Sequence, residues 1–491
     1  MTGARTRAVS GLWTKPKRHT GNRLPAAAVG AGAFFVYLTT LSPTVASNDA
    51  GRFQIAAPVL GTGHPTGYPT FILLGKLFTY LPLGDVAYRV NLMAAVFGAV
   101  AAALLFLVSR EVGSDLLPAA GAAFILAFAS TFWSQATVAE VYTMHAAFLL
   151  GISYLLLRWR GTGRGGYVLL AALLYGISLG NNAGMVLLVP AYLVLLLAGR
   201  YGRLSRRVIS GSAGLFFLGL SVYAYVPIRG FAGAWHNYGD AVNSWADAWV
   251  LVSGARFQGL MSLSPIQLFG GSTKFFQFLF GQAPQPLGFL LGSLLLLGGA
   301  RGAWALLRRD GVVGSAFVAG LGFTLVYALG YRIDDIAVYY IPVYTFLAVF
   351  VAVGVSRSAG YRGRMLLAAV PLLVAVLTLF ANYGEQDRSG YYAERERSEA
   401  VLEQLPEDAV LYGKVQIIPV TYLQEVEGQR ADVTLRWLDG GTQEDHMSSD
   451  VESGRPVYVI SDPRYNEEYL ESTESYARRE QEGALIRLRP R

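Results

Sequence analysis

The feature that most constrains this chain is the repeated alternation of long apolar runs with short basic connections. A helix needs roughly 20 apolar residues to cross a bilayer. Eleven runs approach that length, at residues 24–41, 86–108, 116–132, 138–157, 167–179, 185–197, 208–227, 286–299, 312–330, 337–355 and 365–381. They predict an α-helical polytopic membrane protein with about eleven transmembrane helices. A shorter run at 69–83, interrupted by Lys76, favours an interfacial or re-entrant helix instead.

The composition supports a membrane protein and excludes several other classes. Hydrophobic residues make up 53% of the chain and charged residues only 15%, which is too apolar for an ordinary soluble domain. The net charge of +7 comes from short clusters between the apolar runs, so it indicates membrane topology and not a nucleic-acid partner. The absence of cysteine excludes disulfides and thiolate metal sites.

The positions of the basic residues predict the orientation. Residues 1–23 carry Arg and Lys but no acid, and every second connection after them is basic. By the positive-inside rule we expect the N-terminus to be cytoplasmic and the C-terminus to lie outside. If the chain is prokaryotic, the membrane would be the plasma or inner membrane. The outer connections are then residues 42–69, 133–137, 181–184, 228–285 and 331–336. A signal peptide cleaved near Val45–Ser47 is the competing interpretation, but the many later runs favour a first span.

A change in composition marks a second domain. From residue 383 the chain is charged, with short β-like runs at 409–412, 432–437, 456–460 and 484–488 between Glu-rich helical stretches. We therefore expect a cytoplasmic segment at 1–23, a transmembrane domain at 24–382 and a small outward-facing soluble α/β domain at 383–491.

The first outer connection carries the residues best suited to a catalytic role. Asp49 lies a few residues beyond a span, where a carboxylate is either solvated among headgroups or held for a purpose. A positioned carboxylate shielded from bulk water can take a proton from a hydroxyl nucleophile. His64 lies in a Gly- and Pro-rich stretch, where a lone histidine is more often a surface residue than a catalytic one.

Further polar residues occur at the other outer connections. Glu140, near Tyr142, begins an apolar run, where a charge costs about 2.5–3.5 kcal/mol, so it needs a function or a partner such as Arg89 or Asn91. Arg229 and Arg332 lie in predicted outer connections, against the tendency of basic residues to lie on the cytoplasmic side. Each either binds a phosphate in bidentate fashion or snorkels to lipid headgroups.

Asp334 and Asp335 form an adjacent acidic pair in the connection at 331–336. Two carboxylates could bind a metal ion, but no histidine or third carboxylate lies at a recognisable ligand spacing around them. We therefore expect no metal and no other cofactor.

Several segments resemble the protein O-mannosyltransferase-like membrane family of the transmembrane protein 260 type, the DUF2723 group, within the GT-C glycosyltransferase superfamily. They span about residues 43–437 in the same order. The segments are NDAGRF, GHPTGYPTFILLGKLF and AYRVNLMAA; WSQATVAEVYTMHA; YVPIRG with NYGD; YRIDDIAVYYIPVY; and LPEDAVLYGK with YLQEVEGQRADVTLRWL.

The resemblance implies a GT-C fold with an active site on the outer face. The donor would be a polyprenyl-phosphate-linked sugar, transferred with inversion to a protein Ser or Thr hydroxyl. Asp49 would be the catalytic base, and Arg229, Arg332 and His64 would bind the donor phosphate. The pocket would include Arg52, Tyr68, Glu140, Tyr142, Asn182, Asp240 and Asp334.

The sequence departs from the family pattern at three positions. Arg52 stands where relatives have a second acid, Asn182 where they often have histidine, and Tyr238 where they have tryptophan. A two-carboxylate site in the first connection is therefore not expected.

The main prediction is an inverting glycosyltransferase, with mannose as the default sugar and O-mannosylation as the reaction. Its partners would be the polyprenyl-phosphate sugar lipid and an acceptor protein or glycan. One alternative is a lipid-linked sugar flippase or transporter, although the paired similar halves common in transporters are absent from the sequence. Another is a non-catalytic protein of envelope assembly.

Overall fold

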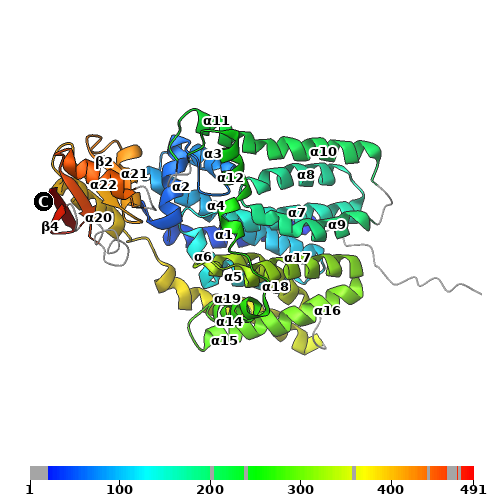
Figure 1. The fold of residues 1–491 in the computed structure, drawn as a ribbon. Helices are drawn as coiled ribbons and strands as arrows, with labels where there is room; N and C mark the ends of the chain where they lie inside the picture. The colour runs from blue at the N-terminus through cyan, green and yellow to red at the C-terminus, as the bar shows by residue number, and fades with distance from the viewer. Residues whose placement is uncertain are drawn as a thin grey trace, which may run out of the picture.

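A computed structural model describes residues 20–199, 204–236, 241–356, 361–438, 443–461, 473 and 477–490. It shows a bundle of long helices with a small sheet domain at one end (Figure 1). The helices of the bundle and its connections are α1 (Arg23–Thr39), α2 (Asn48–Val59), α3 (Pro69–Phe78), α4 (Val86–Glu111), α5 (Leu116–Phe128), α6 (Ser130–Ala136), α7 (Tyr142–Thr162), α8 (Gly166–Leu179), η2 (Ala183–Leu188), α9 (Val189–Leu197), α10 (Arg206–Leu220), α11 (Tyr225–Phe231), α12 (Trp245–Ser253), α13 (Ala255–Gln258), α14 (Pro265–Phe280), α15 (Leu287–Ser293), α16 (Gly299–Arg309), α17 (Gly311–Gly330), η5 (Ile336–Tyr340), α18 (Ile341–Val355) and α19 (Tyr361–Gln386).

The bundle confirms a multi-pass membrane protein. Among the described residues, six helical stretches are long and apolar enough to cross a bilayer, and a seventh arises if α5 and α6, bent by 69°, form one span. The six are Val86–Glu111, Arg206–Phe231, Leu287–Arg309, Gly311–Gly330, Ile336–Val355 and Leu366–Gln386. This criterion gives fewer than the expected eleven because apolar stretches such as α1, α8 and η2 with α9 have fewer than 18 residues.

The first outer connection contains a helix that the sequence did not predict. Residues Asn48–Val59 form α2, with Asp49 in its first turn and Pro58 at its end. A carboxylate in the first turn interacts favourably with the positive end of the helix dipole. Helix formation therefore fixes the direction in which Asp49 leaves the backbone.

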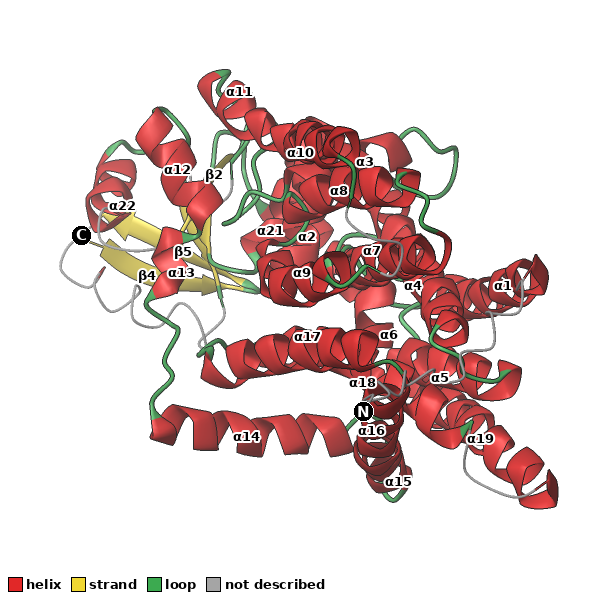
Figure 2. Cartoon of the chain, turned by 90° about the vertical axis from the view of Figure 1, so that its right-hand side faces the viewer, coloured by secondary structure: helices red, strands yellow, loops and turns green. Residues whose placement is uncertain are grey.

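The connection between α11 and α15 is also partly helical. Its longest helix, α14, runs alongside α17 (Figure 2). The shorter α12 and α13 precede it, separated by Gly254, whose φ of +62° suits a glycine.

The C-terminal region forms a five-stranded sheet with the order β2-β1-β3-β5-β4. Its strands are β1 (Val410–Gly413), β2 (Thr434–Trp437), β3 (Val457–Ile460), β4 (Ala477–Glu482) and β5 (Leu485–Pro490). The first three are parallel, and β5 is antiparallel to β3 and β4. Helices α20 (Ala393–Gln404) and α21 (Ile417–Glu425) share one hydrophobic core with the sheet, while α22 (Gln443–Glu452) shares another.

The sheet domain is attached to the bundle through α2 and the start of α4. A Cβ added at Gly51 of α2 would lie 2.6 Å from Cγ2 of Ile418 in α21. The backbone N–H of Ala87 donates to the hydroxyl of Tyr422 at 3.0 Å. Arg395 of α20 binds Glu427 through both carboxylate oxygens at 2.7 Å and also contacts Asp85 at 3.4 Å. The position of α2 therefore depends on the sheet domain.

Candidate functional site

Asp49 is held by two neighbouring side chains. Nη1 of Arg52, one turn along α2, donates to Oδ1 of Asp49 at 2.8 Å. Nε2 of His64 lies 3.7 Å from Oδ2 of the same carboxylate. The Asp49 side chain stays 39% exposed. The carboxylate is thus oriented by Arg52 and still accessible, as a proton acceptor must be.

His64 is fixed within an aromatic cluster. Its ring centroid lies 5.2 Å from that of Phe53 and 4.7 Å from that of Tyr68. Burial lowers the pKa of the imidazole, and the charge of Asp49 offsets this only in part. His64 is therefore neutral near pH 7, so it can donate a hydrogen bond to a phosphate but supplies no fixed positive charge.

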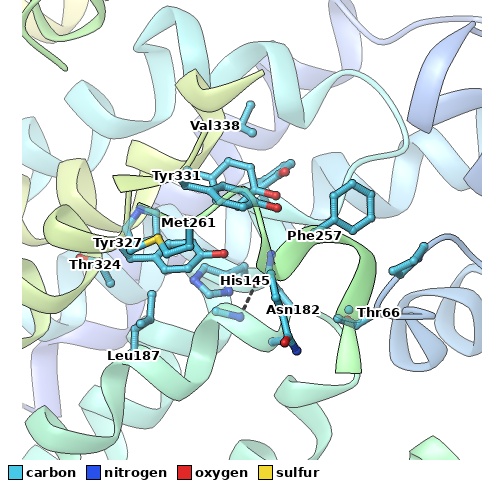
Figure 3. A pocket seen from close by; sticks show the side chains of 18 of the residues that line it. Thr66, His145, Asn182, Leu187, Phe257, Met261, Thr324, Tyr327, Tyr331 and Val338 are labelled. Atoms are coloured by element: carbon cyan, nitrogen blue, oxygen red, sulfur yellow. Dashed lines mark hydrogen bonds between the residues drawn. The ribbon is translucent and has the colours of Figure 1, made fainter. Parts of the chain in front are cut away.

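Tyr68 connects this cluster to a pocket between the helices. The pocket has a volume of about 380 Å³, within the range of small-molecule sites. It is lined from one side by Pro65, Thr66 and Tyr68 and from the others by α7, η2, α13, α17 and η5 (Figure 3). Asp49 does not line the pocket; it lies beside His64, whose ring packs against the pocket residue Tyr68.

Tyr142, a predicted pocket residue, does line this cavity. Its ring packs edge-on against Tyr339, with centroids 5.9 Å apart. Tyr339 in turn packs against Tyr331 at 5.2 Å. Tyr142 of α7, Tyr339 of η5 and Tyr331 after α17 thus form a continuous aromatic wall.

Glu140 lies in the short connection between α6 and α7, and not inside a helix as its apolar context suggested. Burial raises the pKa of its carboxyl, and the charges of Asp49 and Asp335 raise it further. The expected partners are wrong. Arg89 donates to the carbonyls of Leu83, Gly84 and Thr79, and Asn91 is bonded to Gln54 and Ser42. Arg388 is the cation whose charge acts on Glu140.

The two outer arginines have different surroundings. Nε of Arg229 donates to the carbonyl of Leu60 at 2.8 Å and Nη2 to that of Val59 at 3.3 Å, so Arg229 caps the C-terminus of α2. Arg332 is exposed beside the pocket residue Tyr331, and its Nη2 donates to Gly259 at 3.3 Å. Arg332 is the better placed of the two to contact a phosphate at the pocket rim.

The remaining predicted residues fall in three places. Asn182 lines the pocket, where its Oδ1 accepts the backbone N–H of Gly184 at 2.8 Å. Asp334 is exposed in the connection before η5. Asp240 lies outside the described residues, and so does Tyr238. Within the described part of the chain, no group of three or more His, Cys, Asp and Glu residues is arranged to hold a metal ion.

The pocket also contains a residue that the sequence reasoning missed. His145 lines it from α7, and its side chain is 3% exposed. The available signal was an ionisable side chain one turn inside an apolar helix, which is expensive in a membrane and marks a functional site by default.

The chain was compared with known families and relatives. Residues 49–205 match the family described as the protein O-mannosyl-transferase TMEM260 N-terminal domain. The mouse protein O-mannosyl-transferase TMEM260 is 33% identical over 216 residues, which cover 42% of this chain and 30% of that protein. The Dictyostelium discoideum protein of the same name is 26% identical over 209 residues, covering 38% and 25%. The expected family resemblance is confirmed over this region, although the match spans less than a third of these relatives.

Solved structures confirm the fold. ArnT from Cupriavidus metallidurans, bound to undecaprenyl phosphate, aligns with a TM-score of 0.62 at 13% identity, covering 96% of this chain and 98% of ArnT. The oligosaccharyltransferase of Archaeoglobus fulgidus aligns with a TM-score of 0.55 at 14% identity, covering 95% and 73%. The chain therefore has the GT-C fold of polytopic membrane glycosyltransferases.

Proposed function

We propose that this chain is an integral membrane glycosyltransferase that moves a sugar from a polyprenyl-phosphate donor to an acceptor hydroxyl. Mannose is the proposed sugar and a protein Ser or Thr the proposed acceptor, in keeping with the names of the relatives. The GT-C fold and a neighbour bound to undecaprenyl phosphate support a lipid-linked donor. The N-terminus would be cytoplasmic and the site on the outer face.

The observation that carries the proposal is the arrangement around Asp49. The carboxylate is oriented by Arg52, is partly exposed, and lies beside His64, whose ring packs against Tyr68 in the wall of the 380 Å³ pocket. An acceptor hydroxyl can thus approach Asp49 from the exposed side while the sugar of the donor occupies the pocket. An inverting displacement also needs the leaving phosphate on the opposite side of the anomeric carbon from the attacking hydroxyl.

The proposed reaction is a single displacement. The acceptor hydroxyl transfers its proton to Asp49 as its oxygen bonds to the anomeric carbon. The bond from that carbon to the phosphate oxygen breaks, and the electron pair leaves with the polyprenyl phosphate. Because negative charge grows on the phosphate, a cation fixed near it lowers the barrier.

Arg332 is the proposed cation, and neutral His64 is a hydrogen-bond donor to the same phosphate. Arg229 contributes by holding the end of α2 through Val59 and Leu60. No metal is assigned to the reaction, since the arginine can supply the charge that a metal would otherwise provide.

The test uses the purified protein in proteoliposomes with polyprenyl phosphomannose and a Ser/Thr-rich peptide. We expect the peptide to gain hexose, measured by mass spectrometry, with release of one polyprenyl phosphate for each sugar transferred. Movement of the donor between leaflets without a glycosylated product would replace this proposal with a flippase. If the protein yields no glycosylated product and moves no donor between leaflets, a non-catalytic role in envelope assembly would be favoured.

A further inference from the structure

The lining of the pocket carries no formal charge. Its lining residues among the described ranges include five tyrosines, His145, Asn182, Gln258, two Thr and one Ser, but no Asp, Glu, Lys or Arg. A phosphate or carboxylate placed there would lack a counter-charge in a poorly solvated site, which is expensive. The occupant of the pocket is therefore a neutral group.

His145 indicates that this neutral group is polar. Its imidazole makes no hydrogen bond with another described residue, and Nδ1 is buried without a partner. Leaving a buried polar group without a partner costs free energy that a ligand hydrogen bond can recover. A prenyl tail in this position would leave His145 unsatisfied, so a purely apolar occupant is disfavoured.

Asn182 provides a second polar group at the same place. Because its Oδ1 accepts the backbone N–H of Gly184, its amide NH₂ is the group available to donate. Gly184 itself lies against His145, since a Cβ built on it would be 3.8 Å from Cε1 of the ring. Figure 3 shows His145 and Asn182 next to one another at the centre of the pocket.

Tyrosines complete the surroundings. Tyr327 and Tyr331 stack with centroids 5.2 Å apart, and both line the pocket with Tyr68, Tyr142 and Tyr339. Figure 3 places Tyr327 on one side of His145 and Phe257 on the other. Aromatic faces pack well against the C–H faces of a pyranose ring, while phenol, imidazole and amide groups pair with its hydroxyls.

We infer that His145 and Asn182 form a subsite for a neutral polyhydroxylated ring, the sugar of the lipid donor, and that each hydrogen-bonds to a sugar hydroxyl. The inference rests on the proposed function for the identity of the ligand. The lipid phosphate then lies beyond this uncharged lining, toward His64 and Arg332. His145 is a specificity-determining residue, and the proton transfer belongs to Asp49.

Binding, and not turnover, tests this subsite. The full-length protein in nanodiscs is titrated with two probes, polyprenyl phosphomannose and polyprenyl phosphate without sugar. We expect His145→Phe to weaken binding of the mannosyl lipid about tenfold, since it removes the hydrogen bond but retains a planar ring. Binding of polyprenyl phosphate should stay unchanged, and His145→Gln should recover part of the loss.

Two further variants keep the result interpretable. Gly214→Ala lies outside the pocket lining and has nothing within 4 Å of the added Cβ, so it should bind both lipids as the unmodified protein does. Asn182→Ala should weaken mannosyl-lipid binding in the same selective way if His145→Phe does not fold. Equal weakening of both lipids, or no weakening of either, would overturn the subsite.

The outcomes separate this inference from the proposed function. Selective loss of mannosyl-lipid binding in a protein that transfers no sugar would support the subsite and refute the glycosyltransferase. Normal transfer by His145→Phe, with an unchanged KM for the donor, would support the enzyme and refute the subsite. Donors whose sugar lacks one hydroxyl identify the group that His145 contacts. Removing that hydroxyl should weaken binding to the unmodified protein but not to His145→Phe, which no longer makes the hydrogen bond.

Discussion

Substitution of Gly51 by alanine tests whether the close packing of α2 against the Ala46 backbone and Ile418 of α21 fixes the position of Asp49. Gly51 lies two residues after Asp49, where α2 passes close to α21. An added Cβ would overlap the carbonyl oxygen of Ala46 and lie 2.6 Å from Cγ2 of Ile418. Because one of these neighbours is backbone, the clash cannot be relieved by a side-chain rotation, so α2 must move.

The size of the effect follows from these contacts. An ordinary carbon–carbon separation is about 3.5–4.0 Å, so the helix must shift by roughly 1 Å. Overpacking of this kind costs about 1–3 kcal/mol, from which about 1 kcal/mol is recovered by the better helix propensity of alanine. A displacement of about 1 Å at a catalytic group can lower the rate about 100-fold.

The assay compares thermal unfolding in detergent and sugar transfer in proteoliposomes. Gly214→Ala is the matched control, since Gly214 also lies in a helix but has nothing within 4 Å of an added Cβ. We expect Gly51→Ala to unfold at a lower temperature and transfer sugar far more slowly, while Gly214→Ala is unimpaired. Equal behaviour of the two variants would refute the claim that this close approach positions Asp49.

Three further predictions concern charged groups. The pKa of Glu140 is raised in the folded protein, so the folded state holds the proton more tightly, and stability is lost as pH rises from about 4.5 through the raised pKa. We therefore expect the melting temperature of Glu140→Gln, relative to that of the unmodified protein, to rise as pH increases. A difference in melting temperature that does not change with pH would contradict this. Arg395→Met leaves Glu427, Asp85 and Glu399 without their shared cation, so we expect the free energy of unfolding to fall by about 1–3 kcal/mol, a value that the 22% exposure of Arg395 reduces. Proteolysis of the sheet domain should be faster than in the control Arg397→Met, which changes an exposed arginine of the same helix. Arg332→Gln should raise the KM for the lipid donor about tenfold, whereas Arg229→Gln should lower thermal stability without that change in KM; the reverse pattern would exchange their proposed roles.

The sequence predicted the broad architecture because apolar runs and basic connections are direct consequences of the bilayer. Four of the five strands were also predicted, since β1, β2, β3 and β5 are short apolar or alternating runs. Strand β4 was missed because Ala477–Glu482 is an edge strand with an almost entirely exposed, charged sequence. Local sequence gives little signal for such a strand.

Helix α2 was missed for a related reason. Its sequence, NDAGRFQIAAPV, contains Gly and Pro and begins with Asn and Asp, which favours a loop. Its stability comes instead from tertiary packing, including the contact of Gly51 with Ile418, more than 350 residues away in the chain. No reading of local pattern could supply that contact.

The site was predicted in outline but not in its pairings. Tyr68, Tyr142 and Asn182 line one pocket, and Asp49 and His64 lie next to Tyr68 outside its lining. The engagement of Arg229 with α2 depends on a backbone bend that the sequence does not specify. The influence of Arg388 on Glu140 depends on the path of α19 into the sheet domain, which is equally nonlocal.

The most direct test of the account is the transfer rate of Asp49→Asn at saturating polyprenyl phosphosugar. The amide keeps the size of the side chain but cannot accept the hydroxyl proton, so we predict a rate about 10²–10⁴-fold lower, with donor binding and melting temperature close to those of the unmodified protein. Near-normal transfer by a correctly folded Asp49→Asn protein would contradict the assignment of Asp49 as the base.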